Sequence, residues 1–153
     1  MKLKKVAIIS LLVVVMSVLV GCGYKDISVI DLGDELVSIT DSSKYEKGDG
    51  KTLKRYYGLN SNDYEEVSIY VPSSNMEASE LLIIKMKDES QIDTIEASVD
   101  SRIEKQSSGF KDYAPEQYGL VQSYEFSIKG NYAFFAISED AHEMKKQFKD
   151  AIK

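Results

Sequence analysis

The sequence is poor in the residue types that build metal sites and nucleophilic sites. Cys22 is the only cysteine, His142 is the only histidine, and tryptophan is missing from the 153 residues. A single cysteine excludes an intrachain disulfide framework. One histidine, with no cysteine after position 22, cannot assemble a conventional zinc site or a cysteine–histidine dyad. We therefore expect no metal or cofactor, and we interpret His142 as a surface residue of a helix.

Long apolar runs are also missing. The longest extends from Val6 to Val20 and includes two serines, whereas a membrane-spanning helix needs about 20 apolar residues. Three lysines precede this run, and small residues follow it, an order typical of a secretory signal peptide. The end of the run, Leu19-Val20-Gly21-Cys22, resembles the bacterial lipobox.

The lipobox resemblance implies a diacylglyceryl thioether (palmitate included) on Cys22 and cleavage between Gly21 and Cys22. It predicts three parts: a cleaved lipoprotein signal peptide over residues 1–21, a short lipidated tether over residues 22–26, and a single domain over residues 27–153. The protein would then be lipid-anchored at the extracellular face of the cell membrane. Two acyl chains are enough for stable anchoring, whereas one gives only marginal binding.

Positive charge is scarce after position 21. The signal peptide holds three of the 19 basic residues and no acidic ones, so the mature chain has 16 basic against 25 acidic side chains, a net charge of −9. Such a chain is repelled by nucleic acids and by anionic lipid headgroups. We therefore expect no nucleic-acid partner, and membrane contact through the lipid alone. The residues from Gly23 to Asp26 span at most about 14 Å, which keeps the domain near the bilayer.

The hydrophobic pattern predicts an α+β domain. Apolar spacings of three and four residues indicate helices, and alternation indicates half-buried strands. The predicted order is an N-terminal helix followed by β-β-α-β-β-α, which gives a four-stranded, mainly antiparallel sheet with helices packed on one face. The expected elements are helices over residues 27–39, 88–108 and 138–152, and strands over residues 65–71, 80–87, 121–128 and 132–137.

The placement of tyrosine is the one unusual feature of the sequence. Tyr57 and Tyr64 precede the first predicted strand, and Tyr113 and Tyr118 flank the Ala114-Pro115 pair in the central loop. Tyrosine is enriched at sites where one end of the side chain stays wet, so these four residues are candidates for a binding surface. The alternative is that they pack over the edge of the sheet.

Four short motifs carry a family resemblance. They are Tyr57-Gly58-Leu59, Asp63-Tyr64-Glu65-Glu66, Tyr113-Ala114-Pro115 and Lys129-Gly130-Asn131-Tyr132. In this order and spacing, the chain from about Val29 onward resembles Gram-positive lipoproteins that carry domain of unknown function 4358. The resemblance implies a monoderm cell envelope and a lipid-anchored extracellular domain, and it implies no activity.

Two classes of function follow from these features. The first is a non-catalytic binding or interaction module at the cell surface, which acts on an envelope protein or a small ligand. The second is a small envelope hydrolase that uses carboxylates, because paired acids can meet in the fold without any sequence signal. Nothing in the sequence selects two acids among the 25, so we name no catalytic residue and favour the binding module.

Overall fold

A computed structural model describes residues 23–153, and the predicted signal peptide and Cys22 lie outside the described residues. The strands are β1 (Tyr45–Lys47), β2 (Glu66–Pro72), β3 (Glu80–Lys85), β4 (Glu125–Lys129) and β5 (Tyr132–Ile137). The helices are α2 (Val29–Ser38), α3 (Gly50–Tyr57), α4 (Ile92–Phe110), α5 (Pro115–Gln122) and α6 (Ala141–Ala151). Three short 3₁₀ turns complete the fold: η1 (Ser42–Lys44), η2 (Ser61–Asp63) and η3 (Glu89–Gln91).

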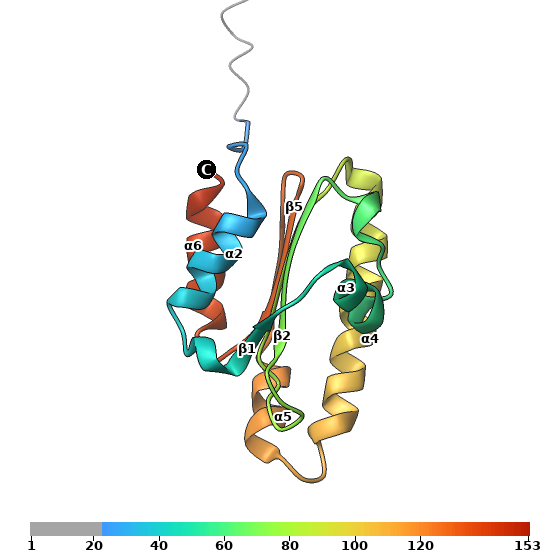
Figure 1. Ribbon diagram of the computed structural model, residues 1–153, viewed down its shortest axis with the longest axis vertical. Helices are drawn as coiled ribbons and strands as arrows, with labels where there is room; N and C mark the ends of the chain where they lie inside the picture. The colour runs from blue at the N-terminus through green and yellow to red at the C-terminus, as the bar shows by residue number, and fades with distance from the viewer. Residues whose placement is uncertain (1–22) are drawn as a thin grey trace, which may run out of the picture.

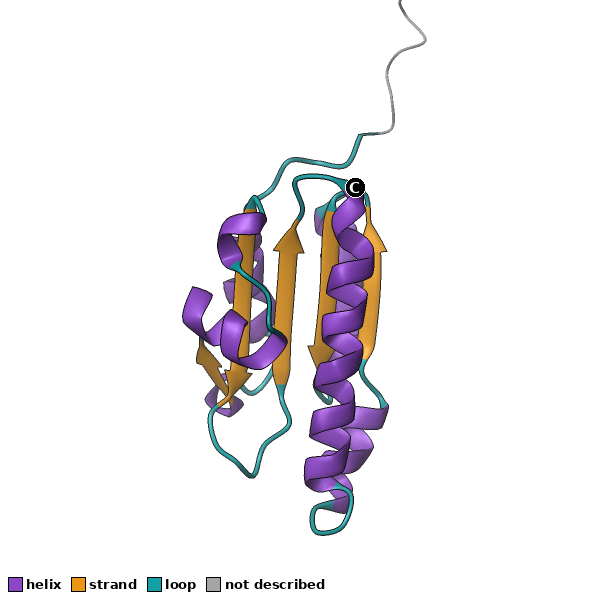
Figure 2. Ribbon diagram, turned by 90° about the vertical axis from the view of Figure 1, so that its right-hand side faces the viewer, coloured by secondary structure: helices purple, strands orange, loops and turns teal. Residues whose placement is uncertain are grey.

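The five strands form one antiparallel sheet in the order β1-β2-β3-β5-β4 (Figures 1 and 2). The α+β class is therefore confirmed, and the expected count of four strands is wrong. The additional strand, β1, pairs with β2 through residues Tyr45 to Lys47. Its two exposed residues, Glu46 and Lys47, leave no alternating pattern, so only tertiary pairing defines it as a strand.

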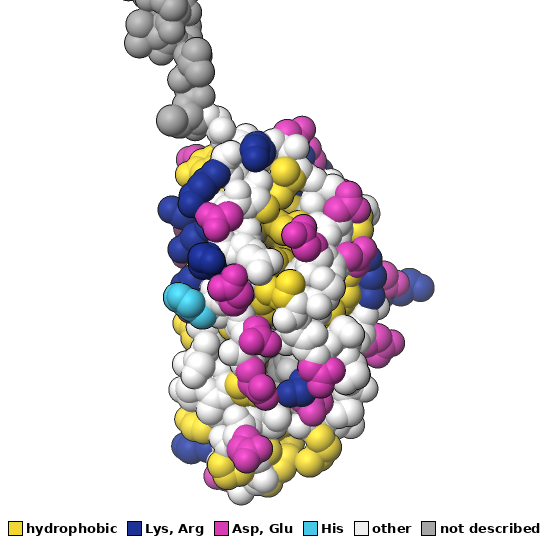
Figure 3. Space-filling model, turned by 90° about the vertical axis from the view of Figure 1, so that its left-hand side faces the viewer, with side chains coloured by type: hydrophobic (Ala, Val, Ile, Leu, Met, Phe, Trp, Pro, Cys, Tyr) yellow, Lys and Arg dark blue, Asp and Glu magenta, His cyan; other side chains and the backbone are white. Residues whose placement is uncertain are grey.

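Helices cover both faces of the sheet, not one face as expected from the sequence. One core joins α2 and α6 to the sheet, and the other core joins α3, α4 and α5 to the opposite face. Strands β3 and β5 are consequently buried along their whole lengths. Their unbroken apolar runs, such as Leu81 to Ile84, are the pattern of a strand covered on both sides. Figure 3 shows the face of α2 and α6, with acidic side chains scattered over much of it.

A helix also replaces the start of a predicted strand. Pro115 occupies the first turn of α5, where its fixed φ angle favours a helix and its missing N–H costs nothing. Because α5 extends to Gln122, the strand expected from Val121 begins only at Glu125. The hairpin predicted at Gly130-Asn131 is confirmed: Lys129 pairs with Tyr132, and Gly130 has a φ of 54° that favours glycine.

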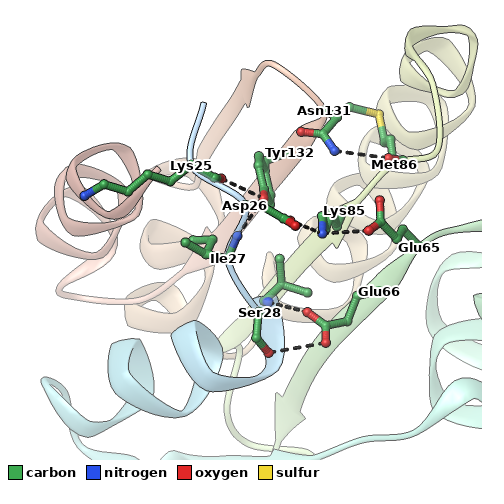
Figure 4. A network of polar contacts seen from close by, with 11 residues as sticks. Lys25, Asp26, Ile27, Ser28, Glu65, Glu66, Lys85, Met86, Asn131 and Tyr132 are labelled. Carbon is green, nitrogen blue, oxygen red and sulfur yellow. Dashed lines mark hydrogen bonds and ion pairs between the residues drawn. The ribbon is translucent and has the colours of Figure 1, made fainter. Parts of the chain in front are cut away.

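Helix α2 packs closely on the sheet because of a glycine. A Cβ atom added at Gly33 would overlap the side chain of Ser68 in β2. The helix begins after Ser28, whose hydroxyl caps the N–H of Asp31. Glu66 of β2 accepts a further hydrogen bond from the N–H of Val29, so the start of α2 is fixed to the sheet (Figure 4).

The segment before α2 is also fixed to the domain. The N–H of Lys25 donates to the carbonyl oxygen of Ile152 at 3.1 Å. The hydroxyl of Tyr132 donates to the carbonyl of Lys25 at 3.0 Å and accepts from the N–H of Ile27 at 3.1 Å (Figure 4). The described part of the predicted tether is therefore bound from Lys25 onward, and the first described residues lie beside the end of α6.

An ion-pair network reinforces the same segment. Lys85 of β3 pairs with Asp26 and, at 2.7 Å, with Glu65 (Figure 4).

Within residues 23–153, no helix combines the length and the apolar character that a bilayer crossing requires.

Candidate functional site

The most buried charge in the described chain is the carboxylate of Glu80, at the start of β3, which has no exposed surface. Three side chains donate to it. Arg102 Nε lies 2.9 Å from Oε1 and 3.1 Å from Oε2, Gln106 Nε2 lies 2.6 Å from Oε1, and the Tyr57 hydroxyl lies 2.6 Å from Oε2. A second Arg102 nitrogen also contacts Oε1. Both oxygens of Glu80 are thus satisfied, as a buried carboxylate requires.

The protonation states in this cluster follow from its surroundings. Burial, and then the negative charge of Glu80, raise the pKa of Tyr57 well above its ordinary value, so the phenol stays neutral. Burial alone would lower the pKa of Arg102, but the hydrogen bonds and charge of Glu80 outweigh it and raise that pKa. The cluster is therefore a fixed ion pair with a neutral tyrosine.

The fixed guanidinium holds an aromatic ring above it. The Arg102 guanidinium carbon lies 4.6 Å from the centre of the Tyr56 ring, and the corresponding atom of Arg55 lies 4.9 Å from that centre. Both distances fall in the range of cation–π contacts. Tyr56 consequently contacts two arginines, one buried and one exposed.

These residues line a surface groove of about 560 Å³. Most of its lining comes from α3, from α4 and from the loop that joins β2 to β3. Its lining residues are Glu46, Arg55, Tyr56, Pro72, Ser73, Ser74, Asn75, Glu77, Arg102, Lys105, Gln106, Gly109, Phe110 and Tyr113. Glu77 buries its Oε2 atom, and no hydrogen-bond donor of the described residues reaches that atom. A ligand N–H or O–H is the chemistry that such an oxygen needs.

The structure does not bring the four predicted tyrosines together on one surface. Tyr113 is 62% exposed at the groove, where its ring contacts that of Phe110. Tyr57 lies in the core with its hydroxyl on Glu80, and Tyr64 is also buried. Tyr118 is half-buried and packs against the core of α3, α4 and α5. Neither Tyr64 nor Tyr118 lines the groove.

The sequence contains a signal for Arg102 and Gln106, which the tyrosine-based prediction of the binding surface did not use. The buried positions of α4 are Ile95, Val99, Arg102, Gln106 and Phe110, with spacings of four, three, four and four. The two polar residues therefore continue the apolar stripe of Ile95 and Val99. Polar side chains at core positions of a helix indicate a buried partner, here Glu80.

Chemistry in this groove is limited by what each carboxylate contacts. Glu80 accepts from three side chains and has no free oxygen for a proton-transfer role. A carboxylate hydrolase, which stays a prediction, would have to use Glu46 and Glu77, the acids that line the groove. Across residues 23–153, no three histidine, cysteine, aspartate or glutamate side chains gather as a metal site would require.

The fold and the groove define a small α+β domain, with helices on both faces of an antiparallel sheet and a polar groove over a buried ion pair. The chain belongs to the family described as domain of unknown function (DUF4358), whose model matches residues 38–138. Every residue that lines the groove falls within that match. No curated protein and no solved structure matches the chain significantly.

Proposed function

We propose that the protein is a lipid-anchored, extracytoplasmic lipoprotein of a Gram-positive cell envelope, and that its domain is a non-catalytic binding module. The lipobox-like end of the signal peptide supports the anchor at Cys22. The ligand binds in the groove beside Tyr56 and Tyr113. It is a segment of an envelope protein, or a small molecule, that carries N–H or O–H donors.

The groove above the Glu80–Arg102 pair is the observation that carries this proposal. Burying an ion pair costs desolvation, and this one fixes the guanidinium that holds Tyr56 against the groove. Tyr56 and Tyr113 supply aromatic area with little conformational entropy to lose on binding. Glu46 and Glu77, the acids that line the groove, supply carboxylate acceptors for N–H or O–H donors of the ligand.

The anchor is tested by metabolic labelling of cells with a tagged fatty acid. We expect the wild type to carry the label and to have its mature N-terminus at position 22. The Cys22→Ala variant should carry no label. Equal labelling of both proteins would show that the lipid is not on Cys22.

The binding site is tested by a photo-reactive amino acid placed at Tyr113 in intact cells. We expect one specific adduct from that position and none from Ile30, an exposed residue of α2 on the opposite face. Tyr56→Ala should abolish the adduct. The matched Tyr118→Ala change should preserve it, because Tyr118 is also half-buried but lies outside the groove. Equal capture by all these proteins would reject the groove as the binding site.

A further inference from the structure

A second groove, of about 520 Å³, runs along α6 to the end of the domain where the first described residues lie. Its lining is cationic: five lysines and His142 contribute to it, and Asp150 is the only acidic residue among the described residues that line it. The lysines are Lys129, Lys145, Lys146, Lys149 and Lys153. Figure 3 shows dark-blue side chains gathered along one edge of this face, below the grey N-terminal segment.

Nearby carboxylates neutralise this groove only in part. Lys145 pairs with Glu125, Lys153 pairs with Asp150 at 2.6 Å, and Lys146 lies 3.6 Å from Glu143. In the described chain, Lys129 and Lys149 have no such partner within 4.0 Å. Five lysines thus face three acids, so the local charge is positive while the mature chain is strongly negative.

The groove includes a residue that follows the predicted lipidation site by two positions in sequence. Tyr24 lines it, and the Tyr24 ring lies against Gly130 in the β4–β5 turn. Tyr24 follows Cys22 by two positions, and two residues of chain span at most about 7 Å. Lys25 is already hydrogen-bonded to Ile152, which prevents the domain from turning freely on a long tether. Tyr24 is 46% exposed, and tyrosine is favoured at membrane interfaces.

We propose that this cationic groove docks on the anionic lipid headgroups of the membrane that holds Cys22. The inference rests on the lipid anchor of the proposed function, and it is independent of the ligand groove. Net charge alone suggested repulsion from such headgroups. Salt screens charges beyond about 8–10 Å, so lysines at the surface outweigh carboxylates on the far side of the domain. Docking orients the domain with α6 and the β4–β5 turn against the bilayer.

The test supplies the anchor chemically, so that its outcome does not depend on lipidation in the cell. Every described helix and strand lies between Val29 and Ala151, so the chain from Cys22 onward contains the whole described fold. Its only thiol, Cys22, is coupled to a maleimide lipid in vesicles of phosphatidylcholine, or of phosphatidylcholine with about 30% phosphatidylglycerol. An amine-reactive reagent and mass spectrometry then report the exposure of each lysine.

We expect labelling of Lys146 and Lys149 to fall about threefold in the anionic vesicles, relative to Lys51 and Lys111 in the same molecules. Lys51 lies in α3 and Lys111 follows α4, both away from the groove. Neutral vesicles should show no difference, and about 0.5 M salt should remove the protection. Equal labelling of both pairs in anionic vesicles would overturn the proposal. Protection of Lys146 and Lys149 that appears with an added soluble polyphosphate, but not with anionic vesicles, would also overturn it.

A pair of charge-matched variants separates the groove from net charge. Lys129 and Lys153 line the same groove and should also be protected in the wild type on anionic vesicles. Lys146→Glu/Lys149→Glu should abolish this protection of Lys129 and Lys153. Lys51→Glu/Lys111→Glu makes the same change in net charge and should leave that protection intact. Loss of protection in both variants would assign it to overall charge and contradict docking through the groove.

Discussion

Arg102 and Glu80 hold together three parts of the molecule that are far apart in sequence. Glu80 begins β3, Arg102 lies in the middle of α4, and Tyr57 ends α3. The pair matters to the site because the guanidinium, bonded to a buried carboxylate through two of its nitrogens, has a fixed position, and Tyr56 contacts it. A buried ion pair is weak evidence for stability in itself, but removal of one partner leaves an uncompensated charge in the core.

Arg102→Met should therefore destabilise the protein by about 3–5 kcal/mol, because the buried Glu80 carboxyl would lose its charge partner and retain only Tyr57 and Gln106 as donors. Urea unfolding followed by circular dichroism measures this change. Lys153→Met is the control, since its pair with Asp150 is exposed and its loss should change stability by no more than about 0.5 kcal/mol. Equal effects of the two substitutions would contradict the structural role of the buried pair.

Tyr70 makes the stability depend on alkaline pH. Burial, and next the hydrogen bond to Asp34, raise its pKa from 10.0 to about 12. Between these two values the unfolded chain has lost the phenolic proton and the folded chain has kept it, so stability falls as pH rises. Tyr70→Phe removes this contribution and should make the decline shallower.

Urea midpoints measured between pH 10.0 and about 12 test this prediction. Tyr113→Phe alters an exposed tyrosine and should leave the decline as steep as in the wild type. If the Tyr70→Phe profile runs parallel to that of the wild type, the proton on Tyr70 does not contribute to the pH dependence.

Among the elements, those with a local signal were predictable. The Gly130-Asn131 turn, the apolar stripes of α2 and α6, and the apolar run of β3 each depend on neighbouring residues. Strand β1 has no such signal, because only its pairing with β2 defines it. Two layers of helices cover the sheet, where the sequence predicted one. The difference arises because β3 is buried on both faces of the sheet and not on one.

The candidate site residues were likewise predictable only where their position depends on a local signal. The sequence predicts that Tyr113 is a partly solvent-exposed aromatic residue of a binding surface. In the structure it is exposed at the groove. Tyr57 had the same sequence character, but the carboxylate of Glu80 places its hydroxyl in the core. That carboxylate is 23 positions away in sequence, and no local pattern links the two residues.

The contact between α2 and β2 predicts opposite effects for two glycines. Gly33→Ala should destabilise the protein by about 1–3 kcal/mol, because the new methyl group would collide with Ser68. Gly109→Ala should stabilise it by about 0.5–1 kcal/mol, because Gly109 lies in α4 and the added Cβ would meet no atom within 4 Å apart from the nearby backbone of its own helix and its chain neighbours. Thermal unfolding of the two variants gives both signs, and destabilisation of equal size in both would refute the close packing of α2.

For the whole molecule, the described N-terminal segment and the end of α6 form one unit. Ile152 is 1% exposed, and its carbonyl accepts from the N–H of Lys25. Deletion of residues 152–153 should therefore increase hydrogen exchange at the Lys25 and Ile27 amides, and it should cost about 2–4 kcal/mol of stability through the lost core side chain. Hydrogen-exchange mass spectrometry and urea unfolding measure the two effects.

Deletion of Lys153 alone is the matched control, because it keeps Ile152 and the hydrogen bond to Lys25. It should leave exchange at the two amides unchanged. If the longer deletion also left them unchanged, the N-terminal segment would not depend on the end of α6 for its position.

The two edges of the sheet bear on whether copies of the protein can pair with one another. A lipid anchor confines molecules to two dimensions, where each meets its neighbours at a high effective concentration. Under such crowding, an open sheet edge invites pairing between copies and eventual aggregation. Here one edge, β1, is only three residues long, and the other, β4, has Glu125 and Lys129 at its ends. If the proposed anchor holds the protein in the plane of a membrane, these short and charged edges would keep colliding copies from joining their sheets.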